Sequence, residues 1–198
     1  MKNQFLIYFL LFSTTGKLLA QDAEPSKNNF GATLSTNLFG LNDDLNHVAV
    51  GGGFYFSRKI TNKFSIYSEL VGSWRNYGDV AISPNLSGEF TTGNLAIYIG
   101  PMVDIGKRMS ISVGFVQNYL FNSELKTETV TYDISAETRN YSSLYFDLRT
   151  SIYKEVSLGT RYEWGINSIF KNSDRKVSTI SFNMFLPLRG KRNQEKNK

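Results

Sequence analysis

Apolar and polar residues alternate with a period of two along most of the chain after Gln21. Period-two alternation is typical of β-strands with one apolar face, because successive side chains of a strand point to opposite faces. Each alternating segment is close to the 9–11 residues that a tilted strand needs to cross a membrane. The segments are residues 30–39, 47–57, 63–75, 92–105, 109–121, 143–153, 156–166 and 177–188. The pattern therefore predicts eight antiparallel strands.

The connections between these segments alternate between short and long. The short ones are residues 58–62, 106–108 and 154–155, and the long polar ones are residues 40–46, 76–91, 122–142 and 167–176. A membrane barrel gives this alternation when its turns lie in the periplasm and its loops lie outside. We therefore predict an all-β fold, an eight-stranded antiparallel transmembrane up-and-down β-barrel that covers residues 21–188.

The first twenty residues have the three-part layout of a secretory signal peptide. Lys2 supplies the positive start, residues 5–12 form an apolar run, and cleavage is expected after Ala20. The run is too short to span a bilayer, which needs about 20 apolar residues. We predict a cleaved signal peptide over residues 1–20 and a basic periplasmic tail over residues 189–198.

Composition and charge exclude several classes of protein. The chain has no cysteine, so it has neither a disulfide framework nor a thiolate metal site. Its net charge of +5 falls to +3 when a signal peptide that contains Lys2 and Lys17 is removed. No basic patch with interleaved aromatic residues appears, so we expect no nucleic-acid binding.

Ionisable residues in the middle of the polar face decide which face points outward. They would pair inside a membrane barrel, whereas an arginine on the lipid face costs about 2–4 kcal/mol. These residues are Glu69, Asp104, Asp147, Arg149, Arg161 and Glu163. The lumen of an eight-stranded barrel is just wide enough for side chains to fill it. We predict that the six form one ionic network that plugs the lumen. A soluble lipocalin-like carrier is the alternative with the opposite sidedness.

Aromatic residues on the apolar face gather near the ends of the segments. Phe56 and Phe64 fall near the inner rim of the predicted barrel. The outer rim would carry Trp74, Tyr119, Phe121 and Trp164. Amphipathic rings at both rims are the girdle expected where a barrel meets lipid headgroups. We therefore predict contact with outer-membrane lipid and lipopolysaccharide.

Three short motifs resemble the PorT-like outer-membrane β-barrel domain family of Gram-negative bacteria. They are Tyr67–Val71, Leu95–Pro101 and the Arg-Tyr-Glu-Trp-Gly-Ile run at residues 161–166. The resemblance covers nearly the whole mature chain, and small barrels such as the OmpA membrane domain and OmpX share the architecture. It implies an outer-membrane location, insertion by the barrel-assembly machinery and, in one branch of the family, a role in a secretion system.

An enzymatic function has little support in the sequence. Outer-membrane lipid A deacylases resemble this barrel but carry a serine two residues after their catalytic histidine. The only histidine here is His47, and Ala49 stands at that position. A hydroxyl nucleophile needs an adjacent base, so a triad of Asp43 or Asp44 with His47 and a loop serine remains only an alternative. We expect no catalytic residue, cofactor or metal site.

The long connection at residues 122–142 contains an alternating stretch of its own, with Val130, Tyr132 and Ile134 on one face. We expect the fifth and sixth strands to extend beyond the membrane here. They would present an edge that recruits another envelope protein by strand addition. A merely solvated hairpin is the alternative. We predict a non-enzymatic outer-membrane barrel that presents extracellular loops in a structural or partner-binding role. The alternatives are an accessory component of a secretion system, a lipid-modifying enzyme and the soluble carrier.

Overall fold

Each alternating segment of the sequence is a strand in the computed structural model. The structure describes residues 28–42, 44–83, 86–106, 108–153 and 156–188, so the predicted signal peptide and basic tail lie outside the described residues. The strands are β1 (Asn28–Leu41), β2 (His47–Lys59), β3 (Phe64–Ser83), β4 (Leu86–Ile105), β5 (Met109–Lys126), β6 (Thr131–Asp133), β7 (Tyr141–Tyr153), β8 (Val156–Gly165) and β9 (Val177–Pro187).

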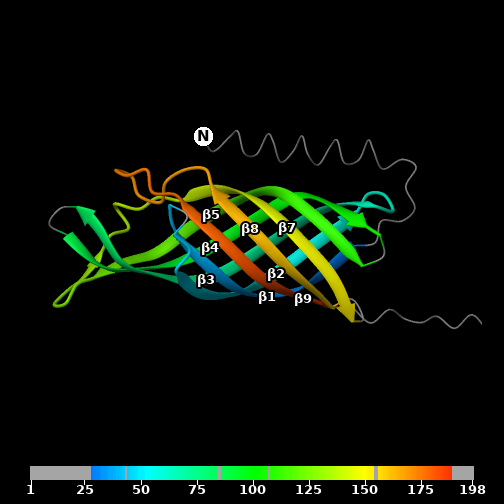
Figure 1. Cartoon of the computed structure of the whole chain (residues 1–198), viewed down its shortest axis with the longest axis horizontal. Coiled ribbons are helices and arrows are strands. Elements are labelled where there is room, and N and C mark those ends of the chain that lie inside the picture. The colour runs from blue at the N-terminus through cyan, green and yellow to red at the C-terminus, as the bar shows by residue number, and fades with distance from the viewer. Residues whose placement is uncertain (1–27, 43, 84–85, 107, 154–155, 189–198) are drawn as a thin grey trace, which may run out of the picture.

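Antiparallel pairing closes the sheet into a barrel. Neighbours along the sheet follow the order β4-β3-β2-β1-β9-β8-β7-β5, and pairing of β4 with β5 completes the ring. The short strand β6 pairs only with β5 and lies outside the ring. The prediction of an eight-stranded antiparallel barrel is therefore confirmed (Figure 1). Among the described residues, no helix has the length and apolarity needed to span a membrane.

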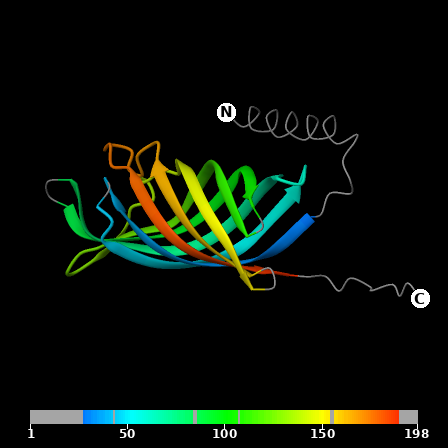
Figure 2. The same cartoon turned by 45° about the vertical axis from the view of Figure 1, so that its right-hand side comes forward.

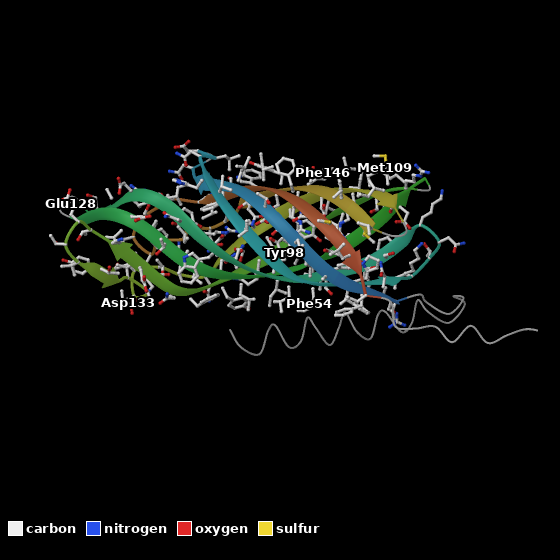
Figure 3. The ribbon with its side chains drawn as sticks, turned by 90° about the horizontal axis from the view of Figure 1, so that it is seen from below. Phe54, Tyr98, Met109, Glu128, Asp133 and Phe146 are labelled. Atoms are coloured by element: carbon white, nitrogen blue, oxygen red, sulfur yellow. The ribbon has the colours of Figure 1, made fainter. Side chains whose placement is uncertain are left out.

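The apolar face of the strands points away from the barrel axis. Phe54 is 54% exposed, whereas the next residue, Tyr55, is 4% exposed. Figure 3 shows Phe54 and Phe146 pointing outward on different sides of the barrel and Tyr98 lying between the walls. The lumen is lined by the polar face, as the mid-strand charges of the sequence predict. Because the outer wall is apolar along its whole circumference, the fold is inside out relative to a soluble barrel.

The two ends of the barrel differ, and we name them by their connections. The turn end carries the short connections that follow β2, β4 and β7. At the hairpin end, β3 and β4 continue far past the neighbouring strands (Figures 1 and 2). We call residues 76–91 and 122–138 the extension. Four paired segments build it, because outer β3 pairs with β4, β4 with β5 and β5 with β6.

The extension corrects the sequence-based interpretation of residues 76–91 as a polar loop. A one-residue bulge interrupts the β3–β4 pairing between Asn76 and Asp79, and Gly78 there has a φ of 61°. A positive φ suits glycine, and the bulge bends the strand without ending it. Of the fifth and sixth predicted strands, only β5 extends, because β7 begins at Tyr141. The strand that pairs with the end of β5 is β6, which belongs to the same connection.

Close approach of neighbouring strands predicts different effects for two adjacent glycines of β2. A methyl group added at Gly53 would overlap the backbone oxygen of Leu70, whereas at Gly52 the nearest atom is the Thr33 backbone oxygen at 3.6 Å. We expect Gly53→Ala to lower the free energy of unfolding by about 1–3 kcal/mol, since the backbone must shift. Gly52→Ala should stay within about 0.5 kcal/mol of the wild type. Urea unfolding in detergent micelles measures both, and equal midpoints for the two variants would contradict the packing.

Candidate functional site

Arg161 of β8 links two walls of the barrel across the lumen. Its Nη2 donates to Glu69 Oε2 on β3 at 2.5 Å and to Asp147 Oδ2 on β7 at 3.1 Å. Three strands separate β3 from β8 in either direction around the barrel, so the Glu69–Arg161 pair spans the lumen. All three side chains are at most 3% exposed. Removing one partner of such a buried pair leaves an uncompensated charge, so the three side chains depend on one another.

Each arginine of the lumen is also held by aromatic rings. The Arg149 guanidinium lies 3.9 Å from the ring centroids of both Tyr67 and Phe185. Its Nε and Nη2 donate to Asp147 Oδ2 at 2.8 and 2.5 Å. Arg161 lies 4.0 Å from the ring centroid of Tyr98. A guanidinium over an aromatic face is attracted by the ring quadrupole, and the attraction grows when water is excluded. The network is therefore aromatic as well as ionic.

The structure places the six ionisable residues predicted for this network in three situations. Glu69, Asp147, Arg149 and Arg161 are joined by direct ion pairs. Glu163 accepts a hydrogen bond from the Tyr98 hydroxyl at 2.6 Å, and Tyr98 lies on Arg161. Asp104 is the exception, because it pairs with Lys59 at 3.1 Å at the turn end and its side chain is 27% exposed. Asp104 is next to the last residue of β4, so its side chain lies at the rim.

Tyrosines and a further arginine contribute to the lumen in ways that the sequence analysis missed. The Tyr67 hydroxyl donates to Glu69 Oε2 at 2.6 Å. Arg75 is 2% exposed, and its Nη1 donates to the Tyr141 hydroxyl at 2.7 Å. The available signal was an aromatic or basic residue on the polar face of a strand. That signal does not identify a partner on a distant strand, such as Tyr141 for Arg75, because such partners are far apart in sequence.

A hydrophobic cluster closes the lumen at the hairpin end, and we call it the cap. Its members come from the barrel, the extension and the β8–β9 connection. They are Phe39, Ala49, Tyr77, Val80, Phe90, Leu125, Ile134, Tyr141, Ile169, Phe170 and Val177. Ile134 was predicted to belong to an exposed binding surface, but it is only 4% exposed. It points into the cap, where burial of its side chain stabilises the base of the extension.

The predicted girdle residues all lie on the outer wall. Phe56 and Phe64, near the turn end, are 40% and 37% exposed. The four nearer the hairpin end are Trp74, Tyr119, Phe121 and Trp164, exposed by 39–59%. Two of these four meet across strands, because the Trp74 and Phe121 rings contact edge to face with centroids 6.5 Å apart. Large rings therefore stand at both ends of the apolar wall.

The extension has an unpaired strand edge at β6. Thr127 N–H donates to the Val130 carbonyl and Ile134 N–H to the Ser123 carbonyl, so the backbone groups of every second residue face β5. The N–H and C=O groups of Thr131 and Asp133 point the other way. Val130 and Tyr132 beside this edge are 47% and 43% exposed. The edge can accept an added strand.

Negative charge dominates the extension. It contains six acidic residues and one lysine, namely Asp79, Glu89, Glu124, Glu128, Asp133 and Glu137 with Lys126. Glu124 lies directly opposite Asp133 in the β5–β6 pairing, where like charges repel. Hydrogen bonds from the Ser135 side chain and backbone lower the pKa of the Asp133 carboxyl, so this side chain stays ionised. Figure 3 shows Glu128 and Asp133 at the far tip of the molecule.

The environment of His47 gives no support to a catalytic triad. Its ring packs against Phe39 and Tyr77, with centroids 5.8 and 6.4 Å away. Asp44 accepts a hydrogen bond from the Asn46 side chain at 3.1 Å, and Asp43 lies outside the described residues. The part of the chain that the structure describes contains no group of three or more His, Cys, Asp or Glu side chains that could hold a metal ion.

Comparison with known proteins identifies the fold and no closer relationship. The sequence matches no family model and no curated protein, so the resemblance to PorT-like barrels has no support there. A crystal structure of Ail, the attachment invasion locus protein of Yersinia pestis, matches with a TM-score of 0.50 at 14% identity over 84% of this chain and 100% of Ail. Ail in complex with the heparin analogue sucrose octasulfate gives 0.51 at 12% identity over 83% and 100%. The outer membrane protein OprG from Pseudomonas aeruginosa gives 0.48 at 11% identity over 82% and 92%. The two Ail structures are outer-membrane barrels, and the likeness to them shows the fold of this chain.

The cross-lumen contacts of Arg161 predict a large loss of stability when its charge is removed. We expect Arg161→Gln to lower the free energy of unfolding by about 3–5 kcal/mol, because Glu69 and Asp147 lose their shared cation. Lys176→Gln, on an exposed side chain at the hairpin end, should change it by less than about 0.5 kcal/mol. Urea unfolding followed by tryptophan fluorescence measures both variants. In a cycle with Glu69→Gln, strictly additive losses would show that the pair is not coupled.

Proposed function

We propose that this protein is a non-enzymatic outer-membrane barrel that presents the extension as a docking platform for another envelope protein. The single observation that carries the proposal is the free β6 edge, which the four-stranded extension holds beyond the rim of a closed barrel. The lumen behind it is filled by the cap and the ionic network. Any binding activity therefore lies outside the lumen.

The outer surface of the barrel supports a location in the outer membrane. The wall is apolar all round, its rings stand at both ends, and the β4–β5 pairing closes the sheet, as a membrane-spanning sheet requires. In bacterial barrels the short turns lie in the periplasm and the longer hairpins outside. With this orientation, the extension of our chain lies outside the cell and the turn end in the periplasm. The likeness to the Ail fold agrees with the same location.

Strand addition at β6 is the mode of binding that the edge supports best. The backbone groups of Thr131 and Asp133 offer two donors and two acceptors at the spacing of a β-ladder. The half-exposed Tyr132 and Val130 side chains provide apolar contacts beside them. Main-chain hydrogen bonds would give affinity and the two side chains selectivity, as in other cases of β-augmentation.

The charge of the extension argues against transferring a polyanion ligand to it. Ail has been solved with a heparin analogue, sucrose octasulfate. A polysulfated ligand needs cations, whereas the extension carries six acidic residues and one lysine. The partner that we propose is therefore a protein with an extended segment that is not acidic. An accessory role in a secretion system would fit such a partner and stays a prediction from the sequence.

The membrane location predicts heat-modifiable migration on gels. Unboiled barrel should migrate differently from boiled chain, because the closed sheet resists detergent at room temperature while boiling opens it. The protein should fractionate with outer membranes, since its apolar wall cannot remain in water. Recovery in the soluble periplasm, with no difference on boiling, would contradict the location.

The edge model predicts the outcome of a matched pair of substitutions at one residue. Thr131→Pro removes the outward N–H of β6, whereas Thr131→Val keeps the N–H and the shape of the side chain. With a photo-crosslinking amino acid at position 132 in living cells, we expect one discrete adduct in the wild type and in Thr131→Val. The adduct should fall about fivefold in Thr131→Pro, since it loses a main-chain hydrogen bond in the complex.

Two controls make this crosslinking experiment decisive. The same amino acid at position 146, on the outer wall, should not give this adduct, because Phe146 lies far from the extension (Figure 3). All variants must keep the heat-modifiable migration of a folded barrel. Equal adducts in Thr131→Pro and Thr131→Val would exclude strand addition at β6.

A further inference from the structure

Basic side chains gather at the turn end, opposite the acidic extension. Arg58 and Lys59 end β2, Lys63 precedes β3 and Arg108 precedes β5, and all four are exposed. The described residues of these strand ends and turns contain one carboxylate, Asp104. We call Arg58, Lys63 and Arg108 the basic rim.

Backbone contacts bring the two turns of this end together. Asp104 N–H donates to the Lys63 carbonyl at 2.8 Å, which joins the β2–β3 turn to the end of β4. Lys59 Nζ pairs with Asp104 Oδ2 at 3.1 Å. Since Lys59 occupies this carboxylate, no ion pair within the described residues neutralises the three side chains of the basic rim.

The position of the basic rim along the barrel corresponds to the headgroup layer. Phe56 and Phe64 are lipid-facing residues of the last apolar row, and Ile105 and Met109 continue the row with exposures of 49% and 42%. Arg58 lies on the same outward face as Phe56, two residues further along β2 and opposite Asn28 of β1. A long basic side chain at this level keeps its stem on apolar surface while its charge reaches the interface.

We propose that the basic rim binds the phosphate groups of anionic phospholipids in the periplasmic leaflet. The inference rests on the proposed membrane location, which puts the turn end in that leaflet. Three cations without an ion-pair partner among the described residues, at the end of an apolar wall, match a ligand with an anionic head and apolar chains. Lipopolysaccharide phosphates would meet the hairpin end instead, so the ligand that we propose is a phospholipid.

The test measures lipid selectivity of the full-length folded barrel. The protein is reconstituted in phosphatidylcholine vesicles with spin-labelled phosphatidylglycerol or spin-labelled phosphatidylcholine, and electron paramagnetic resonance gives the relative association of the two lipids. Each cation near an anionic surface increases association by about fivefold at low salt. We expect the wild type to prefer phosphatidylglycerol by about fivefold or more, and 0.5 M NaCl, the condition chosen for screening, to remove the preference.

Two triple variants with the same change in charge separate the basic rim from the rest of the protein. Arg58→Gln, Lys63→Gln and Arg108→Gln together should bring the preference close to one. Lys171→Gln, Arg175→Gln and Lys176→Gln together, in the β8–β9 connection at the hairpin end, should leave it unchanged. Single Arg58→Gln should give an intermediate value, and it guards against misfolding of the triple variant.

Several results would overturn the inference. The wild type could show no preference for phosphatidylglycerol, or the basic-rim triple variant could keep the full preference. The two triple variants could lose the preference equally, or inorganic phosphate at low ionic strength could remove it. The last result would indicate a site for free phosphate. Failure of the proposed membrane location looks different, because neither lipid would then show a motionally restricted population and boiling would not change migration on gels.

Discussion

Closure of the sheet, which pairs the backbone N–H and C=O groups of neighbouring strands, is the constraint on which the rest of this structure depends. An apolar wall all round the barrel tolerates no free edge, so β1 must meet β9 and β4 must meet β5. Closure turns the polar face inward, where eight strands leave little room. The ionic and aromatic contacts of the lumen follow from this confinement. Past the rim, the sheet leaves edges unpaired at β6 and along the outer part of β3.

Confinement also explains why charge and aromatic rings occur together in the lumen. Arg149 and Arg161 have no water to solvate them, because they are 6% and 1% exposed. Carboxylates satisfy part of each guanidinium, and rings of Tyr67, Phe185 and Tyr98 cover its faces. A purely apolar filling would leave the polar strand faces without partners, and a purely ionic one would leave voids. The lumen combines both kinds of contact in one layer, with the apolar cap above it.

The fold could be predicted from the sequence because the period-two alternation of apolar and polar residues and the lengths of the connections are local properties. The alternation around Phe54 and Tyr55 gives the correct faces, and the short–long connections give the correct ends. The contacts within the lumen were harder to predict from the sequence, because the Glu69–Arg161 and Tyr98–Glu163 contacts join residues more than sixty positions apart. Asp104 is a carboxylate on the polar face of its strand, as the carboxylates of the network are, and only its place at a strand end separates it from them. The β3–β4 part of the extension escaped notice because its strands are polar and the bulge at Gly78 interrupts their alternation.

The length of β3 sets how high the extension stands. β3 contains twenty residues, and the β2–β3 register, continued to the start of β2, places His47 level with Tyr77, so six residues of β3 lie past that level. At ~3.3 Å per residue and the usual tilt of barrel strands, those residues rise roughly 15 Å above the rim. A headgroup layer is only about 5–8 Å thick on each side of a bilayer. In the proposed membrane location, the tip of the extension therefore stands clear of the headgroup layer, and a partner that contacts this tip needs no lipid-inserting part of its own.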